Sequence, residues 1–169
     1  MDITQLILDD HAEQRRLFAL IEEIPPDNND ALRAVWNQLR ALLDAHALAE
    51  ERFFYPELLK IGRGADCKSP VEETRDAIKD HNEIRDAAGK VKDERSGSSE
   101  WFAAVAAANH ANSDHMGEEE RQGLADFRRS ADLALRHRLG VEFLQFRSEH
   151  LLGVAPVDQN PDAYVRANS

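Results

Sequence analysis

The chain has 169 residues with only 8 glycines and 6 prolines, a composition that favours helix, and its net charge is −11. An acidic surface repels nucleic acid and anionic membranes, so we expect neither as a partner. Cys67 is the only cysteine, which excludes an intrachain disulfide and favours a reducing compartment. No signal peptide is evident, and no apolar run approaches the roughly 20 residues that span a membrane, so we expect a cytoplasmic protein.

Two long helices are predicted in the first part of the chain. Asp2 can cap a helix over residues 3–23, which Pro25 and its neighbour end. A run of Asn and Asp residues then caps a second helix over about 29–61. We expect Pro56 to bend its last turns.

Two further helices follow a glycine-containing loop over residues 62–68. Ser69, Pro70 and Glu72 form a strong helix start, and this third helix is predicted to end near residue 95. After a short Ser-Gly-Ser-Ser connection, a fourth helix is predicted from about residue 100 through Glu119, fraying around residue 123.

The C-terminal part contributes a fifth predicted helix over about residues 130–152. Residues after Gly153 include two prolines and are predicted to form a loosely attached, irregular tail. The predicted fold class is all-α: an antiparallel up-down four-helix bundle over 1–125, a C-terminal helix over 126–152 that packs on or extends the bundle, and the tail over 153–169.

Four histidines recur about 35 residues apart, one on each of the first four predicted helices, and the second and fourth are each followed four residues later by glutamate. Residues four apart share a helix face, and these polar residues interrupt apolar stripes that face the core. The stretches of helix between each histidine and the adjacent turns have similar lengths. Antiparallel packing of the helices therefore brings the four histidines to the same height along the bundle axis. The set is His11, His46, Glu50, His81, His115 and Glu119.

This set of residue types suits a pair of metal ions. A carboxylate in a dry bundle is costly unless it is paired, protonated or metal-bound, and one carboxylate can join two metals. We assign His11 and His46 to one metal, His81 and His115 to the other, and Glu50 and Glu119 as bridges. Without metal, we expect the glutamates to be protonated and the histidines neutral. The absence of thiolate ligands argues against a structural zinc site.

The series His11, His46-Ala-Leu-Ala-Glu50, His81 and His115-Met-Gly-Glu-Glu119 resembles the hemerythrin-like, or HHE cation-binding, domain over about residues 3–125. The stretch Glu50-Glu51-Arg52-Phe53-Phe54-Tyr55-Pro56 is similar to a stretch common in that family. The resemblance implies a four-helix bundle around two iron ions joined by an oxo or hydroxo bridge, with zinc or manganese as substitutes. It also implies a small diatomic or peroxide ligand: dioxygen, nitric oxide or peroxide.

The chain departs from the oxygen-carrying members of that family, which use a fifth histidine in a His-x-x-x-His pair on the third helix. The residues four before and four after His81 are Ala77 and Arg85. We therefore expect a more open iron and a catalase-like removal of peroxide. The alternatives are a sensor or iron-handling module without turnover, or a helical interaction module with a vestigial site. The oligomeric state stays open.

Neighbouring polar residues have less specific predicted roles. His110 lies off the core stripe and would need a distorted helix to reach a metal. We expect Tyr55 to pack with its hydroxyl near the surface. Glu51, Glu118 and Glu120 flank the predicted bridges and are expected to be solvated.

Overall fold

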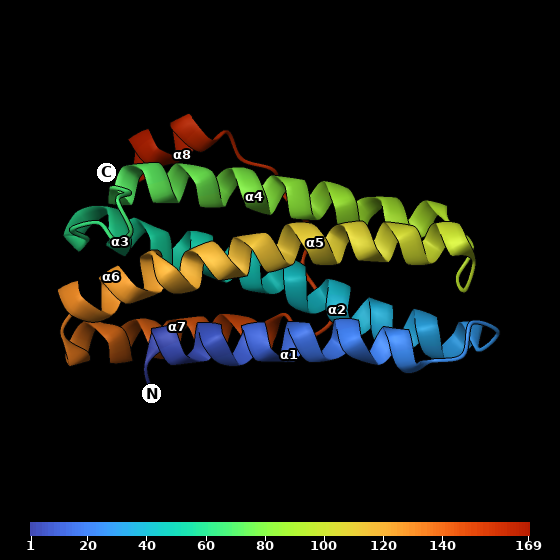
Figure 1. The fold of residues 1–169 in the computed structure, drawn as a ribbon. Helices are drawn as coiled ribbons and strands as arrows, with labels where there is room; N and C mark the ends of the chain where they lie inside the picture. The colour runs from blue at the N-terminus through green and yellow to red at the C-terminus, as the bar shows by residue number, and fades with distance from the viewer.

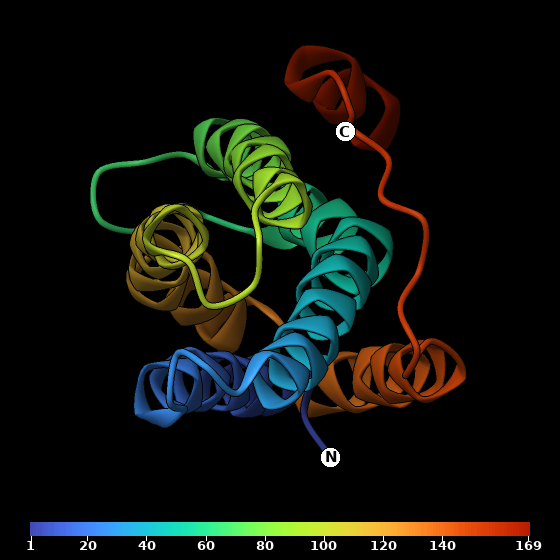
Figure 2. The same cartoon turned by 90° about the vertical axis from the view of Figure 1, so that its right-hand side faces the viewer.

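A computed structural model describes residues 1–169 and shows a bundle of long helices with no sheet (Figure 1). Viewed from its end, the long helices surround the bundle axis in the order in which they occur in the chain (Figure 2). This confirms the predicted all-α four-helix bundle. The four are α1 (Ile3–Glu23), α2 (Asn29–Ala49), α4 (Pro70–Lys90) and α5 (Ser99–Arg121).

The second predicted helix contains a π-helical turn that the sequence did not predict. After α2, residues Glu50–Phe54 form this wider turn, and α3 (Tyr55–Ile61) continues in the same direction. The Tyr55 amide donates to the Glu50 carbonyl, five residues back. Because Pro56 has no amide hydrogen and cannot continue the α-helical pattern, a local widening at this position is understandable.

The ends of α4 and α5 differ in detail from the prediction. The capping box at Ser69 begins α4 as predicted, but the helix ends at Lys90 and a single 3-10 turn (Val91–Asp93) follows it. After α5 the chain does not fray: it turns and forms α6 (Gly123–Ser130). A Cβ atom at Gly123 would overlap a carboxylate oxygen of Glu73 on α4, so a larger residue here would require the buried Glu73 side chain to move.

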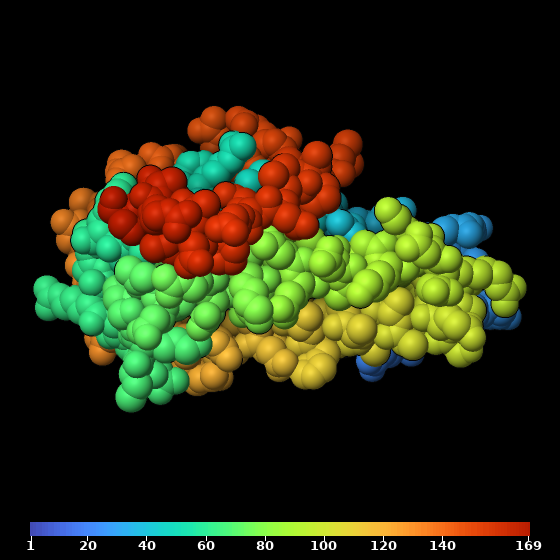
Figure 3. All heavy atoms as spheres, turned by 90° about the horizontal axis from the view of Figure 1, so that it is seen from above, coloured from blue at the N-terminus to red at the C-terminus, as the bar shows by residue number.

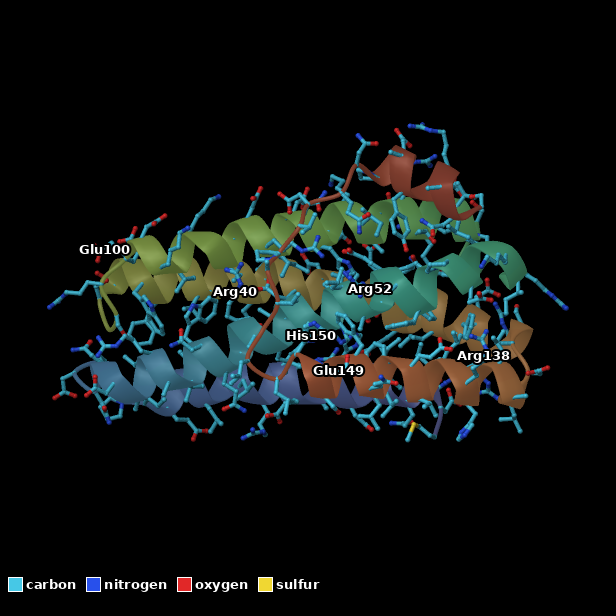
Figure 4. The ribbon with its side chains drawn as sticks, turned by 180° about the vertical axis from the view of Figure 1, so that it is seen from behind. Arg40, Arg52, Glu100, Arg138, Glu149 and His150 are labelled. Atoms are coloured by element: carbon cyan, nitrogen blue, oxygen red, sulfur yellow. The ribbon has the colours of Figure 1, made fainter.

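The C-terminal segment is ordered against the bundle, so the expectation of an irregular tail is wrong for its last residues. Helix α7 (Leu133–Glu149) packs along α1 and α2, and the chain then crosses α2 between Arg40 and Arg52 (Figure 4). Helix α8 (Pro161–Asn168) lies on α4, with the preceding linker beside it (Figure 3). Tyr164 of α8 is buried, which anchors the segment.

The core consists of two apolar clusters separated by the layer of histidines. One cluster includes Trp36 and Trp101, whose rings meet edge to face 6.3 Å apart. The other includes Phe54, Phe127 and Phe143 at the end covered by α6 and α7. No helix combines the length and the apolar character that a membrane crossing requires. The apolar clusters fix the helices on both sides of the polar layer, so its side chains are held in place.

Candidate metal centre

The six predicted ligand residues lie together in the middle of the bundle. None of them is more than 4% exposed. Their donor atoms form two groups in which all atoms lie within 4.8 Å of one another, and only Glu50 belongs to both. The first group is His11, His46, Glu50 and Glu119, and the second is Glu50, His81 and His115.

Glu50 joins the two groups through its two carboxylate oxygens. Its Oε1 lies 2.9 Å from His46 Nε2, and its Oε2 lies 3.2 Å from His81 Nε2. Glu119 is different: its Oε2 lies 3.3 Å from His11 Nε2, while its Oε1 accepts a hydrogen bond from a tyrosine. The two glutamates therefore are not the equivalent bridges that the sequence pattern led us to expect.

Tyr55 is the tyrosine that donates to Glu119, at 2.6 Å, and the expectation that its hydroxyl lies near the surface is wrong. Its side chain is fully buried. The π-helical turn explains the error, because it places Tyr55, five residues after Glu50, on the inward face. Burial and the neighbouring Glu119 and Glu50 carboxylates raise the pKa of Tyr55 well above its usual value, so the hydroxyl keeps its proton.

Four outer carboxylates each approach the Nδ1 atom of one histidine. Each is adjacent in sequence to a predicted ligand of its own helix, yet it serves the histidine of the next helix around the bundle. Such partners orient an imidazole and leave Nε2 aimed at the centre. The pairs are Asp10 with His46 (3.0 Å), Glu51 with His81 (2.8 Å), Asp80 with His115 (3.6 Å) and Glu120 with His11 (2.9 Å).

Arginines neutralise three of these four outer carboxylates. The expectation that Glu51 and Glu120 are solvated is wrong, since Glu51 is buried and both bind a histidine. Asp80 alone has no arginine partner. The three pairs are Arg147 with Asp10 (2.9 Å), Arg85 with Glu51 (2.6 Å) and Arg15 with Glu120 (2.7 Å).

The charge state of the metal-free centre also differs from the prediction. Burial alone would lower the pKa of His46, but Glu50 and Asp10 outweigh it and raise this pKa to about 10. Glu50 and Glu51 likewise raise the pKa of His81 to about 9, against the effect of burial. Burial opposes ionisation of Glu50 too, yet His46 and His81 hold its pKa well below the usual value. At Glu50, His46 and His81 a carboxylate and imidazolium groups therefore neutralise each other, where we expected uncharged groups.

Several buried donor atoms of the centre lack a hydrogen-bond partner, as expected for atoms that bind metal. Buried polar atoms without partners are costly, and metal ions would satisfy these atoms. In addition, His81 Nε2 and His115 Nε2 face each other at 3.1 Å, where one proton at most can lie between them. The buried donor atoms without a hydrogen-bond partner include His11 Nε2, His46 Nε2, both oxygens of Glu50 and Glu119 Oε2.

Glu73 is a buried carboxylate beside the centre that sequence analysis missed. It is 4% exposed, neither oxygen has a hydrogen-bond partner, and it lines a small cavity with His115 and Glu119. Burial and the charges of Glu119 and Asp126 raise its pKa to about 8. A signal was present, because Glu73, Ala77 and His81 follow at intervals of four on one helix.

His110 does not reach the centre. Its side chain is 79% exposed and pairs with Asp114 on the helix surface, as its place off the core stripe indicated. Ala77 and Arg85, at the positions four before and four after His81, are both buried. Ala77 lines the small cavity, whereas Arg85 is bound to Glu51.

Comparison with known proteins identifies the family. The model of the hemerythrin HHE cation binding domain matches residues 2–125, a range that is most of the chain and contains the six predicted ligand residues. No curated protein and no solved structure matches. The chain belongs to the hemerythrin HHE cation-binding domain family, whose members bind metal ions.

Proposed function

We propose that this protein holds two iron ions and binds a small ligand, dioxygen, nitric oxide or peroxide, with peroxide removal as its activity. Glu50 carries the proposal, because its two oxygens lie against imidazoles of different pairs. His11 and His46 would hold one ion, and His81 and His115 the other. Glu119 would add a ligand beside His11. Bound iron would supply the electrons that exchange with a small oxygen or nitrogen species.

The room beside the centre favours a small ligand over an organic substrate. The inner cavity at His115 and Glu119 has a volume of about 10 Å³, close to the space of one water molecule. Pockets for larger organic molecules typically measure about 300–1,000 Å³. The chain's own groups would orient what enters: Tyr55 keeps its proton at Oη, and the apolar clusters exclude water from the layer.

Metal content and turnover test this proposal in sequence. Iron-loaded protein should contain two ions per chain and absorb in the near-ultraviolet, as a bridged ferric pair does. It should release oxygen steadily from hydrogen peroxide, and His115→Ala should abolish the release. His110→Ala is the matched control, because it removes an exposed imidazole from the same helix. Loaded protein without turnover would rule out peroxide removal, and protein without metal would rule out the whole proposal.

A second candidate function, an iron- or oxygen-responsive sensor, is favoured by two hydrogen bonds from the C-terminal segment to Glu51. Gln159 donates to the Glu51 carboxylate, and the Tyr164 hydroxyl donates to the Glu51 carbonyl. Glu51 also binds His81, so a change at the metal has a short path to α8. Hydrogen exchange of residues 150–169 with and without iron tests this path. Equal protection in both states would contradict it.

A further inference from the structure

A groove lined by carboxylates runs between α4 and α5 towards the centre. Two hollows lie along it and share Asp80, His115 and Glu118 as lining residues. The outer one has a volume of about 220 Å³ and the inner one about 10 Å³. We call this feature the acidic groove. Besides Glu119 of the centre, its carboxylates are Glu73, Asp76, Asp80, Glu83, Asp114 and Glu118.

The inner end of the acidic groove carries a carboxylate with no structural partner. Glu73 is buried, and neither of its oxygens accepts a hydrogen bond. An acidic surface alone would be unremarkable in a chain with a net charge of −11. A buried carboxylate without a partner is costly, however, and its cavity also contacts His115 and Glu119. The Glu73 carboxylate is therefore placed to contact a positive ion at the inner end of the acidic groove.

The mouth of the inner hollow is bridged by one lysine. The ammonium of Lys68 lies 2.9 Å from Asp76 on α4 and 3.1 Å from Glu118 on α5, so it occupies the position of a cation between them. Lys68 belongs to the loop between α3 and α4, which reaches round to the outside of α5 (Figure 2). A tight turn holds it there, with reciprocal backbone hydrogen bonds between Ala65 and Lys68.

The other charged groups of the groove lie at its outer edge. Lys79 pairs with Glu83 at 2.9 Å, and His110 pairs with Asp114 at 3.1 Å, both among exposed side chains. Asp80 is the one outer carboxylate of the centre without an arginine partner, and it lines both hollows. Lys68 is therefore the one cationic side chain that bridges two carboxylates of the inner hollow.

We propose that the acidic groove is the route by which divalent metal ions reach the centre, with Lys68 across its mouth and Glu73 as its innermost carboxylate. An incoming ion displaces the Lys68 ammonium from Asp76 and Glu118, passes Glu73, and arrives beside His115. Here the second group has only three donors, Glu50, His81 and His115, and is the more open of the two. This inference rests on the proposed metal-binding function.

The rate of metal uptake by the full-length, metal-free chain tests the route. Co(II) is the probe, because its visible absorbance on binding can be followed by rapid mixing. Lys68→Met should load faster than the wild type, by about fivefold, and Glu73→Gln should load more slowly, by about tenfold. The amount of Co(II) bound at equilibrium should stay the same in both. Glu142→Gln on α7 is the matched control, since it removes one exposed carboxylate away from the groove.

The outcomes distinguish a failure of the proposed entry route from a failure of the proposed metal-binding function. A wild type that binds no metal at equilibrium overturns both proposals. A wild type that loads fully, with Lys68→Met and Glu73→Gln at the rate of Glu142→Gln, overturns the route alone. If Glu73→Gln does not fold, the comparison of Lys68→Met with Glu142→Gln decides the route, and equal uptake rates overturn it. Melting temperatures distinguish the roles of Lys68, because a purely structural lysine would alter melting without altering the uptake rate.

Discussion

The two halves of the centre are built from the same residue types but are enclosed differently. The half formed by His11 and His46 lies under α7, where Phe143 packs edge to face on His46 with ring centres 6.1 Å apart. Arg147 from the same helix pairs with Asp10, the outer partner of His46. This closed half is surrounded by packed and paired side chains.

The half formed by His81 and His115 opens towards the acidic groove. Asp80, the outer partner of His115, has no arginine, and Ala77, four residues before His81, lines the inner hollow. Side chains of α7 thus pack on the half at His46, whereas the half at His81 and His115 faces the carboxylates of the acidic groove. If the two halves differ in this way, substitutions in each should have unequal effects on metal affinity and stability.

Replacing Glu50 should have the largest effect, because its carboxylate serves both halves. Glu50→Gln should lower metal affinity by more than about 100-fold at both positions, beyond the loss expected for an outer partner. Glu119→Gln should spare the half at His81 and His115. Elemental analysis after dialysis gives the metal content. Equal loss of both metals in Glu119→Gln would show that the halves are not distinct.

Replacing an outer carboxylate should destabilise the metal-free protein in one half of the centre but not in the other. Asp10→Asn and Asp80→Asn should each lower metal affinity by about 10–100-fold, since each orients one imidazole. Only Asp10→Asn also leaves Arg147 without its carboxylate, at a cost of about 1–3 kcal/mol. Urea unfolding of the metal-free variants measures this difference. Equal destabilisation by both would contradict an enclosed half at His46.

Tyr55→Phe should destabilise the metal-free protein by about 1–3 kcal/mol, because it leaves Glu119 Oε1 buried without its donor. The matched control is Tyr164→Phe, which removes a hydroxyl that donates to a neutral backbone carbonyl. We expect the control to cost less, since bonds to charged acceptors are stronger. Thermal melting at constant pH compares the two. A smaller loss in Tyr55→Phe would contradict its role at Glu119.

Glu73 should have no effect at a single low pH and should show itself only as a pH dependence of the metal-free protein. Its pKa is raised from 4.5 to about 8 in the folded state, so folded chains keep a proton that unfolded chains lose. Stability should therefore fall as pH rises between these values, by at most about 1.4 kcal/mol per pH unit, and level off above them. Glu73→Gln lacks this contribution, so the stability difference between it and the wild type should change only within that window.

The sequence was sufficient for the bundle and for the six inward side chains. Both follow from the period of the helix, since a polar residue at a core position has one direction to point. The same reasoning failed from Glu50 to Tyr55, because a π-helical turn changes the period itself. It also missed Glu51, whose burial depends on Arg85 and on Gln159 and Tyr164, far away in the chain.

The tail was misjudged for a related reason. Prolines at the start of a short segment indicate a break, but they do not exclude a helix that begins at Pro161 after an Asn160 cap. Its stability comes from the burial of Tyr164 against the bundle, which only the three-dimensional arrangement shows. Charge states were misjudged because we considered the burial of each group alone, without the opposite charge beside it.

The alternation of outer carboxylates around the bundle limits how the chain can change in length. Each of the four helices gives a carboxylate to one neighbour and receives one from the other. If one helix slid by a single turn of about 5.4 Å, it would lose the contact that it gives and the contact that it receives. Insertions between a cap and a histidine would thus disturb three helices together. Changes of length are tolerable only in the connections at the two ends.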